Sequence, residues 1–551
     1  MKKICITVIA ICLLTTGLIF FINRMDKTSN HEPIRINSDL EFDVKFPSRV
    51  ISEFEINGTG KDYCIYIGNC SKPFSIVNCI LYAASTKWDS TEWYMPYTCS
   101  GLILYNVTNG NVINNVIMSN NDDGISLVNS SKMYISSNTV KSNQHTGISI
   151  YNSCENIISE NNCLDNDNGI AVGVSERNIL MGNLCKNNYR GILVSNSASN
   201  VLVNNTYSDN RDSGVEIFSC EYILLKNNTM NNNGIDIGGG LLKNWNTHSI
   251  DRSNVINGRP IYYLKNKTGG KIPKESSEVI LANCTNINIE GLNINNGSRG
   301  IQLGFSDNNT IINNTIIFNK GYSISLSISN NNAISKNLIS LNFRGIVVWH
   351  SKRNIIKENI ITENKDYGII INSQFNHIFY NNFERNNYRT GCAQAMDCIG
   401  ESFWNASDKG NYWSDWTTPD IDSNGFIDKP YFPDGGAGAN DSYPLTKPIK
   451  DAGKWIEMND IKNIITIENE TYGQTFTADK KFCQVGVYAS SNGNNIGTLY
   501  AALYGDADKS RYIGYYAFVN YRTIRGLTLR CRCRNRVNIT LNGLRATLRK
   551  A

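Results

Sequence analysis

The amino-acid sequence repeats itself with a period of about 22 residues. Each repeat begins with a glycine that is followed by a branched apolar residue, and one position carries Ser323 instead of the glycine. The starting glycines are Gly124, Gly147, Gly169, Gly191, Gly214, Gly234, Gly300, Gly345 and Gly368. A fixed period of this length is typical of a solenoid, in which every repeat forms one coil that stacks on its neighbours.

The pattern inside each repeat decides which solenoid this is. The first clear unit, GISLVNSSKMYISSNTVKSNQHT (124–146), has short alternating runs separated by Asn and Ser turns, and no leucine consensus or helical segment. Alternation directs every second Ile or Val inward, and coils stacked at about 4.8 Å pair each strand with the coils on either side. The chain has only 11 Pro, while Asn and Gly supply left-handed turn positions. We therefore predict an all-β protein whose main part is a parallel β-helix with three strands per coil.

Asparagine recurs once per coil at a fixed place. A residue in this position stacks on its own equivalent, and side-chain amides in such a column can hydrogen-bond along the axis. The predicted column contains Asn138, Asn161, Asn183, Asn205 and Asn228. We interpret it as structural.

The first thirty residues read as an export signal. MKK precedes an uncharged run from Ile4 to Ile22, and charge returns at Arg24. The run is about long enough to span a bilayer, and no small-x-small cleavage site follows it. Residues 1–30 are predicted to be a signal peptide or a membrane anchor, which places the protein outside the cell or on its surface and allows membrane contact only through this segment.

The sixteen cysteines show no paired metal spacing. In an oxidising compartment two groups are disulfide candidates, with undecided pairing in the first. These groups are Cys64, Cys70, Cys79 and Cys99, and Cys392 with Cys398. Free buried thiols are the alternative for Cys154, Cys163, Cys185 and Cys220.

A candidate catalytic group lies where the first clear coils turn. Asp122 and His145 are 23 residues apart and Asp167 follows 22 later, so all three are expected in one column, while Asp123 begins a neighbouring column that later carries Arg190. An Asp pair followed one coil later by a His near Gly-Ile-Ser resembles the polygalacturonases. The resemblance implies that Asp122 and Asp123 supply general acid and base and that His145 tunes their protonation.

Three features depart from that pattern. The preceding coil reads YTCSG instead of Asn-Thr-Asp, Thr146 separates the histidine from its glycine, and only SERNI near Arg177 stands where Arg-Ile-Lys is expected. Solvated turn residues at a coil corner explain the same letters, and we favour that interpretation.

Other segments resemble right-handed parallel β-helix repeat proteins related to NosD, a periplasmic protein associated with copper-site maturation of nitrous oxide reductase. NVINGRPIYYLKNKTGG (254–270) and VILANCTNINIEGLNINN (279–296) resemble the central segment of that family. NASDKGNYWSDW (405–416) and DSYPL (441–445) resemble the terminal motif of its archaeal cell-surface relatives. The resemblance covers residues 48–445 and implies a right-handed β-helix.

A role in copper binding is implied by the family resemblance alone, and the residues of this chain do not indicate it. Cu(I) favours Met, Cys or His at close spacing. The five histidines stand apart, at His31, His145, His248, His350 and His377, and no Met-rich tract is present. We do not expect copper binding.

The end of the β-helix is predicted to be covered by an aromatic cap in residues 401–449, with Trp404, Tyr412, Trp413 and Trp416. The early segment from Asp39, including Phe46 and Phe54, is expected to cover the other end. A loop in the C-terminal cap resembles an oxygen-rich Ca²⁺ turn, with Tyr431 in place of the twelfth-position Glu. Its candidate ligands are Asp420, Asp422, Asn424 and Asp428. A polar turn without an ion is the alternative.

The domain boundaries follow from where the register holds. Residues 31–400 form the predicted β-helix, with an insertion near 240–278 in which Lys267 to Lys274 loop out. Residues 450–551 alternate like a small β-sandwich and end in an Arg-rich tail. By composition the tail suits an anionic surface or nucleic acid. We interpret it as a truncated or out-of-frame end of an incomplete domain, and expect no nucleic-acid partner.

These observations leave two main classes of function. The first is an exported, non-enzymatic rod that binds surface glycans or other surface proteins. The alternative is a carbohydrate-active enzyme such as a polygalacturonase-like hydrolase or a polysaccharide lyase; a periplasmic copper-site maturation factor is the second alternative. An enzyme is expected to gather carboxylates with Arg, Lys or His along one groove, whereas a rod should scatter them.

Overall fold

The structure is a computed structural model that describes residues 28–85, 99–387, 391–407, 409–436 and 438–449, and the backbone of seven strands between 472 and 547. The chain divides into two units, Met1–Pro448 and Ile449–Ala551. Among the described residues, no helix combines the length and apolar character needed to cross a membrane. The predicted signal or anchor falls almost wholly on residues 1–27, which lie outside the described part.

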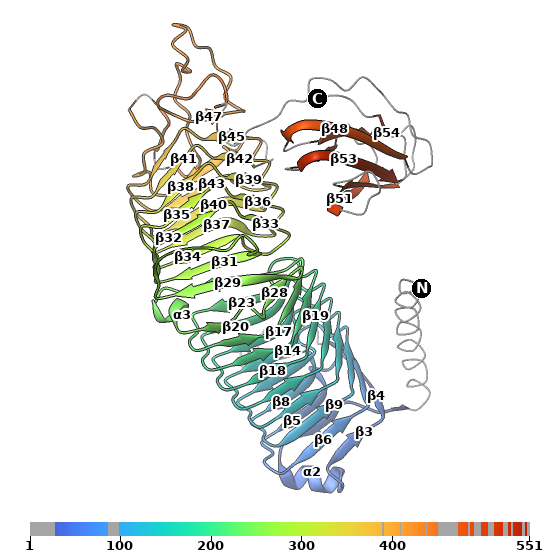
Figure 1. Ribbon diagram of the computed structural model, residues 1–551. Helices are drawn as coiled ribbons and strands as arrows, with labels where there is room; N and C mark the ends of the chain where they lie inside the picture. The colour runs from blue at the N-terminus through green and yellow to red at the C-terminus, as the bar shows by residue number, and fades with distance from the viewer. Residues whose placement is uncertain are drawn as a thin grey trace. The chain divides into compact units, whose positions relative to one another are not determined.

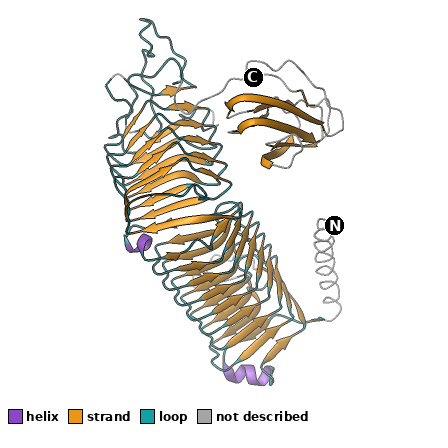
Figure 2. Cartoon of the chain, viewed as in Figure 1, coloured by secondary structure: helices purple, strands orange, loops and turns teal. Residues whose placement is uncertain are grey.

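The first unit is a parallel β-helix, as predicted, and it consists of two successive stacks of coils (Figures 1 and 2). Each coil contributes one strand to each of three sheets, here called sheets I, II and III in chain order from the starting glycine. The only helices in the described residues are α2 (Asp39–Lys45) and α3 (Lys243–Asn246).

The N-terminal stack contains all three sheets. Sheet I is formed by β2 (Ile34–Ile36), β5 (Tyr63–Gly68), β8 (Ser100–Tyr105), β11 (Ile125–Val128), β14 (Thr146–Tyr151), β17 (Asn168–Gly173), β20 (Arg190–Ser195), β23 (Val215–Phe218) and β26 (Ile235–Gly238). Sheet II is formed by β3 (Val50–Ser52), β6 (Phe74–Val77), β9 (Gly110–Ile113), β12 (Tyr134–Ser136), β15 (Ile157–Ser159), β18 (Ile179–Met181), β21 (Val201–Val203), β24 (Leu224–Lys226) and β27 (Ser249–Ile250). Sheet III is formed by β1 (Ser29–Asn30), β4 (Phe54–Thr59), β7 (Ile80–Ser85), β10 (Val116–Met118), β13 (Thr139–Lys141), β16 (Asn162–Leu164), β19 (Leu184–Lys186), β22 (Thr206–Ser208), β25 (Thr229–Asn231) and β28 (Val255–Ile256).

The C-terminal stack repeats this arrangement. Sheet I is formed by β29 (Arg259–Lys265), β31 (Glu278–Ala282), β34 (Ile301–Gly304), β37 (Tyr322–Ser327), β40 (Arg344–Trp349), β43 (Ile369–Asn372) and β46 (Ala395–Asp397). Sheet II is formed by β30 (Thr268–Lys271), β32 (Thr285–Glu290), β35 (Thr310–Ile312), β38 (Ala333–Ser335), β41 (Ile355–Lys357) and β44 (His377–Phe379). Sheet III is formed by β33 (Asn293–Asn295), β36 (Thr315–Ile317), β39 (Leu338–Ser340), β42 (Ile360–Thr362), β45 (Asn382–Glu384) and β47 (Tyr412–Trp413).

The boundary between the stacks differs from the predicted insertion. β28 pairs antiparallel with β29, which interrupts the parallel register after Ile256. The segment predicted to loop out instead supplies β30, which pairs in parallel with β32. That part of the prediction was wrong. KTGGK has no inward apolar residue, but its backbone still forms the parallel ladder with β32.

Side chains of the C-terminal stack cover the open strand edge at the end of the N-terminal stack. The backbone N–H of Ile235 donates to Glu278 Oε2 at 3.1 Å, and that of Ile237 donates to Gln302 Oε1 at 3.1 Å. Gln302 Nε2 donates back to the carbonyl of Ile235 at 2.8 Å. An uncovered edge would leave these backbone groups unpaired. The C-terminal stack therefore acts as the cap of the N-terminal stack.

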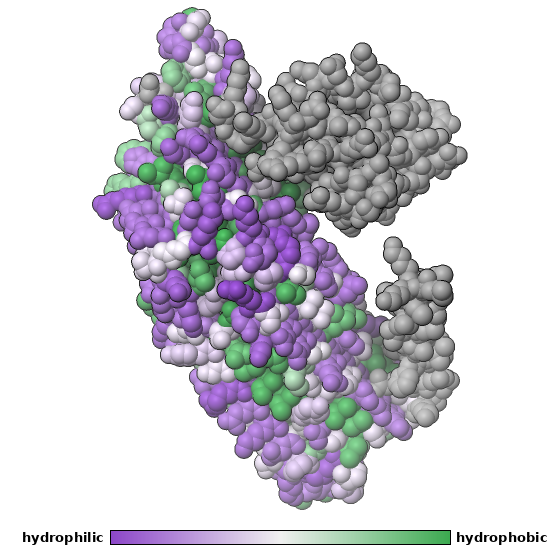
Figure 3. Space-filling model, viewed as in Figure 1, coloured by the Kyte–Doolittle hydropathy of each residue, from purple (hydrophilic) through white to green (hydrophobic). Residues whose placement is uncertain are grey.

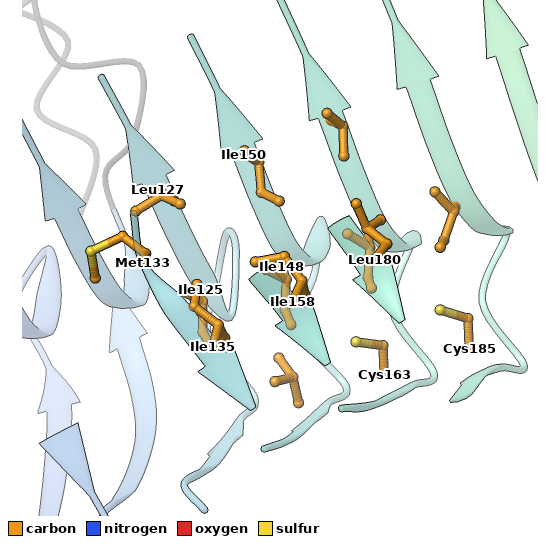
Figure 4. Packing of buried hydrophobic residues seen from close by; sticks show 14 of the residues in the cluster. Ile125, Leu127, Met133, Ile135, Ile148, Ile150, Ile158, Cys163, Leu180 and Cys185 are labelled. Carbon is orange, nitrogen blue, oxygen red and sulfur yellow. The ribbon is translucent and has the colours of Figure 1, made fainter. Parts of the chain in front are cut away.

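Stacked aliphatic side chains form the interior. The first inward position of sheet I is apolar in consecutive coils and pairs in register, for example Ile125 with Ile148 and Ile170 with Ile192. Figure 4 shows such side chains from neighbouring coils pointing into one shared interior, with Cys163 and Cys185 among them. On the outside, hydrophilic residues cover most of the face shown in Figure 3, between separate apolar patches.

The predicted asparagine column is confirmed. Asn138 Nδ2 donates to Asn161 Oδ1 at 2.9 Å, and the bonding continues in the same way through Asn183, Asn205 and Asn228. A second ladder was missed by the sequence reasoning and runs one corner further along each coil, just before the starting glycine. It contains Asn120, Asn143, Asn166, Asn188, Asn210 and Asn233.

The starting glycines are explained by close approach between coils. A Cβ at Gly147 would lie 2.5 Å from the carbonyl oxygen of Gly169, and a Cβ at Gly169 would lie 2.5 Å from that of Gly191. No side chain fits there. The repeat of glycine is therefore a consequence of stacking.

The disulfide prediction was wrong. None of the eleven cysteines whose side chains the structure describes forms a disulfide. Cys64, Cys70 and Cys79 are buried, and their thiols donate to backbone carbonyls, such as that of Tyr82 for Cys64. Burial raises the pKa of the Cys64 thiol to about 12 and that of Cys70 to about 11. These cysteines fill the core as small apolar residues and give no support to an oxidising compartment.

Both predicted caps are present. At the N-terminal end Phe42 of α2 is buried, with Phe46 and Phe54 packed on the same core. At the other end Trp404 and Trp413 are fully buried. Trp413 stacks between Phe383 and Tyr431, with ring centroids 4.2 Å and 3.8 Å away.

The second unit has two antiparallel sheets. One contains β48 (Tyr472–Phe482), β53 (Cys533–Asn542), β50 (Gly497–Tyr504) and β51 (Tyr512–Tyr521), and the other contains β52 (Leu527–Leu529), β49 (Val485–Ala489) and β54 (Ala546–Thr547). Part of the Arg-rich tail forms β53, which lies between β48 and β50. A sandwich packing of the two sheets stays a prediction.

Candidate functional site

The corner that leads from sheet III into sheet I carries a row of functional side chains, here called the corner column. Its members in the N-terminal stack are Asp122, His145, Asp167, Tyr189 and Asp212. From His145 onward, the backbone N–H of each member donates to the carbonyl of the preceding one, at 3.2, 2.7, 2.7 and 2.8 Å. The predicted alignment of Asp122, His145 and Asp167 is thus confirmed.

A second row lies one residue closer to the glycines. Thr146 pairs with Asn168, and Asn168 with Arg190, in the strand register. Asp123 begins this row, because its Oδ1 accepts from the backbone N–H of Thr146 at 3.0 Å. The predicted path from Asp123 to Arg190 is therefore also confirmed.

Asp122, Asp123 and His145 meet at one point. His145 Nδ1 lies 3.0 Å from Asp123 Oδ1 and 3.7 Å from Asp122 Oδ1. The side chain of Asp123 is only 4% exposed, against 29% for Asp122 and 62% for His145. Asp123 therefore holds His145 in position from its buried side, while Asp122 and His145 are the groups that a ligand can reach.

Burial and charge shift the protonation of the two reachable groups. Burial, followed by the neighbouring Asp123, raises the pKa of Asp122 to about 7. The hydrogen bond that His145 donates to the Asp123 carboxylate raises the pKa of His145 to about 9. At neutral pH the corner thus holds a partly protonated carboxyl beside an imidazolium.

We predict that this corner makes the protein less stable as pH rises. The folded pKa of Asp122 is about 7 against an ordinary 3.8, so the folded chain binds more protons between pH 4 and 7 and loses stability across that window. His145, at about 9 against 6.5, extends the loss to pH 9. Asp122→Asn should flatten the pH dependence of the unfolding free energy between pH 4 and 7 by about 3 kcal/mol.

Chemical denaturation at a series of pH values measures this. Asp165→Asn, at an exposed position of a nearby coil, is the matched control and should leave the pH dependence unchanged. An equal change in both variants would contradict the assignment.

The corner column continues with the ring of Tyr189, and the guanidinium of Arg190 in the second row lies beside it. Tyr189 is 41% exposed, and the Arg190 guanidinium lies 4.8 Å from its ring centroid. Arg190 Nε donates to Glu216 of the next coil. Two carboxylates, Asp122 and Asp167, therefore flank His145, and an aromatic platform follows them.

The same corner of the C-terminal stack also carries charged and aromatic side chains. Arg299 is 7% exposed at its side chain and bonds to Asp212, at 2.9 Å, and to Asp236. Tyr322 and Arg344 follow in register, and Arg344 Nε donates to Asp366 Oδ2 at 2.6 Å. Because Arg299 joins the two stacks at Asp212, the row of charged and aromatic groups crosses the boundary between them.

Sequence reasoning missed the residues of the C-terminal stack. A signal was present in YRGIL (189–193), SRGIQ (298–302) and FRGIV (343–347), where arginine stands directly before the starting glycine.

An enzyme was expected to gather carboxylates with basic groups in one place. In the described residues, Asp122, Asp123 and His145 form the only group of three close carboxyl, imidazole or thiol ligands.

The loop of the C-terminal cap forms a polar turn. Asp420 accepts from the backbone N–H of Asn424 at 3.1 Å and of Gly425 at 3.0 Å, and Asp428 accepts from that of Ile421 at 2.7 Å. Asn424 Nδ2 donates to Asp422 Oδ2 at 2.8 Å. The carboxylates are engaged with the turn itself, and Ca²⁺ binding by these residues stays a prediction.

Ca²⁺ at millimolar concentration is expected to raise the melting temperature of the intact protein, because an ion that binds only the folded state stabilises it by mass action. At 100 times the dissociation constant the gain is about 2.7 kcal/mol. Asp422→Asn should remove the shift. Mg²⁺ and a chelator serve as controls, and a melting temperature that is the same under all conditions leaves the loop as a turn only.

Two known protein families match this chain, one mainly in each stack. The family described as "Periplasmic copper-binding protein (NosD)" matches residues 241–418, and the family described as "Right handed beta helix region" matches residues 100–256. The chain is a NosD-like right-handed β-helix repeat protein. The two matches overlap over residues 241–256, at the end of the N-terminal stack of this NosD-like chain.

Solved structures similar to this NosD-like chain are also β-helix proteins. The Dettilon tailspike protein is 12% identical, with 94% of this chain and 87% of that chain covered and a TM-score of 0.27. A double mutant of the periplasmic alginate epimerase AlgG is 12% identical over 66% of this chain and 71% of that chain, with a TM-score of 0.21. The A-module of a mannuronan C-5 epimerase from Azotobacter vinelandii is 11% identical over 66% and 96%, with a TM-score of 0.21. The comparison with curated proteins gives no match.

Copper does not fit the residues of the stretch that matches NosD. His248 is buried, accepts from the N–H of Ile223 at Nδ1 and contacts the Asn244 carbonyl at 2.8 Å through Nε2. His377 stacks on Phe403, with ring centroids 4.8 Å apart. Within the described residues, no group of three close His, Cys or carboxylate ligands falls in that stretch. The soft or imidazole-rich ligand set that copper favours is therefore not assembled there.

Proposed function

We propose that this chain is an exported β-helix protein that binds a polysaccharide along the corner column. The observation that carries the proposal is the unbroken series Asp122, His145, Asp167, Tyr189 and Asp212, one side chain per coil. A rigid row of polar groups with an exposed ring suits a chain of sugars, which offers hydroxyl groups at regular intervals and apolar faces for stacking. The charged start, apolar run and returning charge of residues 1–30 support export. So does the periplasmic description of the matching family.

Binding is tested with the full chain on arrays and in titrations of soluble polysaccharides. Tyr189→Ala should lower the affinity at least tenfold. Tyr222→Ala, which removes a ring that is 60% exposed at the sheet I to sheet II turn, is the control and should not. Absence of binding to every acidic and neutral polysaccharide would refute the proposal and leave a protein-binding rod.

Hydrolysis of a glycosidic bond at the same place is a second candidate. The specific observation in its favour is that Asp122 and Asp167 flank His145, two coils apart. Two coil spacings amount to about 9–10 Å, close to the upper end of the roughly 6.5–9.5 Å found between the carboxyls of inverting glycosidases. Asp123 is too deeply buried for the base role that the polygalacturonase resemblance implies.

In this candidate mechanism Asp122 gives its proton to the glycosidic oxygen as the bond to the anomeric carbon breaks. Asp167 takes a proton from a water molecule, whose oxygen bonds to the anomeric carbon from the opposite face, so the configuration inverts. A carboxyl with a pKa of about 7 suits a general acid at neutral pH. His145, held by Asp123, places positive charge between the two carboxyl groups.

Release of reducing ends from polygalacturonate and neutral glucans measures this activity. Asp122→Asn and Asp167→Asn should each lower turnover at least about 100-fold, whereas Asp165→Asn should not. Binding without turnover on any of these polymers would rule out the second candidate and leave the first intact.

A further inference from the structure

Two pairs of residues occupy the same corner position in the two stacks. Tyr189–Arg190 stands directly before Gly191 at the start of β20, and Phe343–Arg344 stands directly before Gly345 at the start of β40. In both pairs the aromatic residue follows a ladder asparagine and the arginine begins a strand of sheet I. The chain therefore presents one arrangement twice, on the same corner of two successive stacks.

The two pairs also share their geometry. Tyr189 is 41% and Phe343 36% exposed, and the guanidinium of the adjacent arginine lies 4.8 Å and 5.3 Å from the respective ring centroid. Each arginine side chain is about one quarter exposed, at 26% and 28%. Each Nε donates to a carboxylate of the following coil, Glu216 or Asp366. The carboxylate holds each guanidinium through Nε, and Arg344 Nη1 also donates to the hydroxyl of Tyr322 at 3.4 Å.

This combination has a defined ligand chemistry. An exposed ring face packs against the apolar face of a sugar ring, and the outer edge of a guanidinium matches a carboxylate through two parallel hydrogen bonds. Lys365 adds positive charge at the second pair, with its Nζ 5.8 Å from the Phe343 ring. We infer that the Tyr189–Arg190 and Phe343–Arg344 pairs are two equivalent subsites for sugars that carry a carboxylate, and that one acidic polysaccharide chain occupies both.

The junction between the stacks supports simultaneous occupancy. Arg299 bonds to Asp212, which lies one coil after Tyr189, and Arg344 lies two coils after Arg299. The subsites are thus separated by a few coil spacings, on the order of 20 Å. A short oligosaccharide fills one subsite, whereas a polymer reaches both and gains affinity from the second contact being intramolecular.

This inference rests on the proposed polysaccharide binding and adds its substrate class and its two-point attachment. Calorimetric titration of the full chain with polygalacturonate tests it, with galacturonate trimers and a neutral dextran as comparison ligands. We expect two trimers per chain, a polymer affinity at least 100-fold above that of the trimer, and at least 10-fold weaker binding of dextran.

Variants separate the two subsites. Tyr189→Ala and Phe343→Ala should each reduce the trimer stoichiometry from two to one and remove most of the polymer advantage, and the double variant should bind neither. Arg344→Gln should weaken galacturonate binding and leave dextran binding unchanged. Phe218→Ala removes a ring that is 50% exposed at the far end of β23 and is the control, with circular dichroism confirming the fold of each variant.

The outcomes distinguish this inference from the proposal beneath it. Polymer binding that the single variants leave unchanged, one trimer per chain, or equal affinity for dextran would overturn the inference and keep polysaccharide binding. Failure to bind acidic and neutral polymers alike would overturn both.

Discussion

Replacing Asn161 by alanine is expected to lower the free energy of unfolding by about 3 kcal/mol or more, because it breaks a ladder that is buried on both sides. Asn161 Nδ2 donates to the Ile135 carbonyl at 2.9 Å and to Asn183 Oδ1 at 3.0 Å. Its Oδ1 accepts from the backbone N–H and the Nδ2 of Asn138, at 3.0 and 2.9 Å. Alanine leaves the buried Asn138 backbone N–H without the acceptor that Asn161 provides, and it removes the side-chain donor to the Ile135 carbonyl.

The next residue provides the control. Asn162 has the same side chain but is exposed, so Asn162→Ala should cost no more than about 0.5 kcal/mol. Denaturant unfolding gives the free energies, and hydrogen exchange should show the loss of protection centred on β12 and β15, since each coil contacts only its neighbours. Equal destabilisation by both variants would show that the ladder contributes nothing beyond a surface asparagine.

Arg299→Gln is expected to cost about 3–5 kcal/mol and to uncouple the two stacks. Arg299 lies between Asp212 and Asp236, and its guanidinium provides the positive charge that both carboxylates contact. Removing one partner of a buried ion pair leaves uncompensated charge, which is far more costly than losing a surface pair. Burial alone would lower the pKa of Arg299, but the charges of Asp236 and Asp212 outweigh it and raise the pKa above its usual value.

The expected signature is a change in cooperativity. With Arg299 intact, the N-terminal and C-terminal stacks should unfold in one transition. The variant should show two, since most of the buried residues of each stack belong to a cluster of their own and only Ile261, Ile280 and Ala282 of the C-terminal stack pack into the first cluster. Arg211→Gln changes an exposed arginine of the adjacent N-terminal coil and should leave one transition. A single transition at unchanged denaturant concentration in Arg299→Gln would contradict the role given to this residue.

The cysteines show how a composition argument fails when the fold is repetitive. Cys64, Cys70, Cys79 and Cys99 are close in sequence, which suggested disulfides, but they are buried and form none. Each coil offers several inward positions that accept a small apolar side chain. Proximity in sequence therefore says little about whether two cysteines face each other.

The sequence by itself determined the coil, its three strands, the first asparagine ladder, both caps and the alignment of Asp122, His145 and Asp167. Apart from the caps, which the aromatic residues at the two ends of the repeat predict, these features depend on contacts between residues one coil apart, so a constant offset of 22 or 23 residues predicts them. Only the tertiary structure decided that Asp123 is buried beneath His145, that the parallel register stops after Ile256, and that Arg299 bonds to Asp212 and Asp236 across 87 and 63 residues. The physical reason is that the junction breaks the constant offset, and burial there depends on how two stacks meet, which no local periodicity encodes.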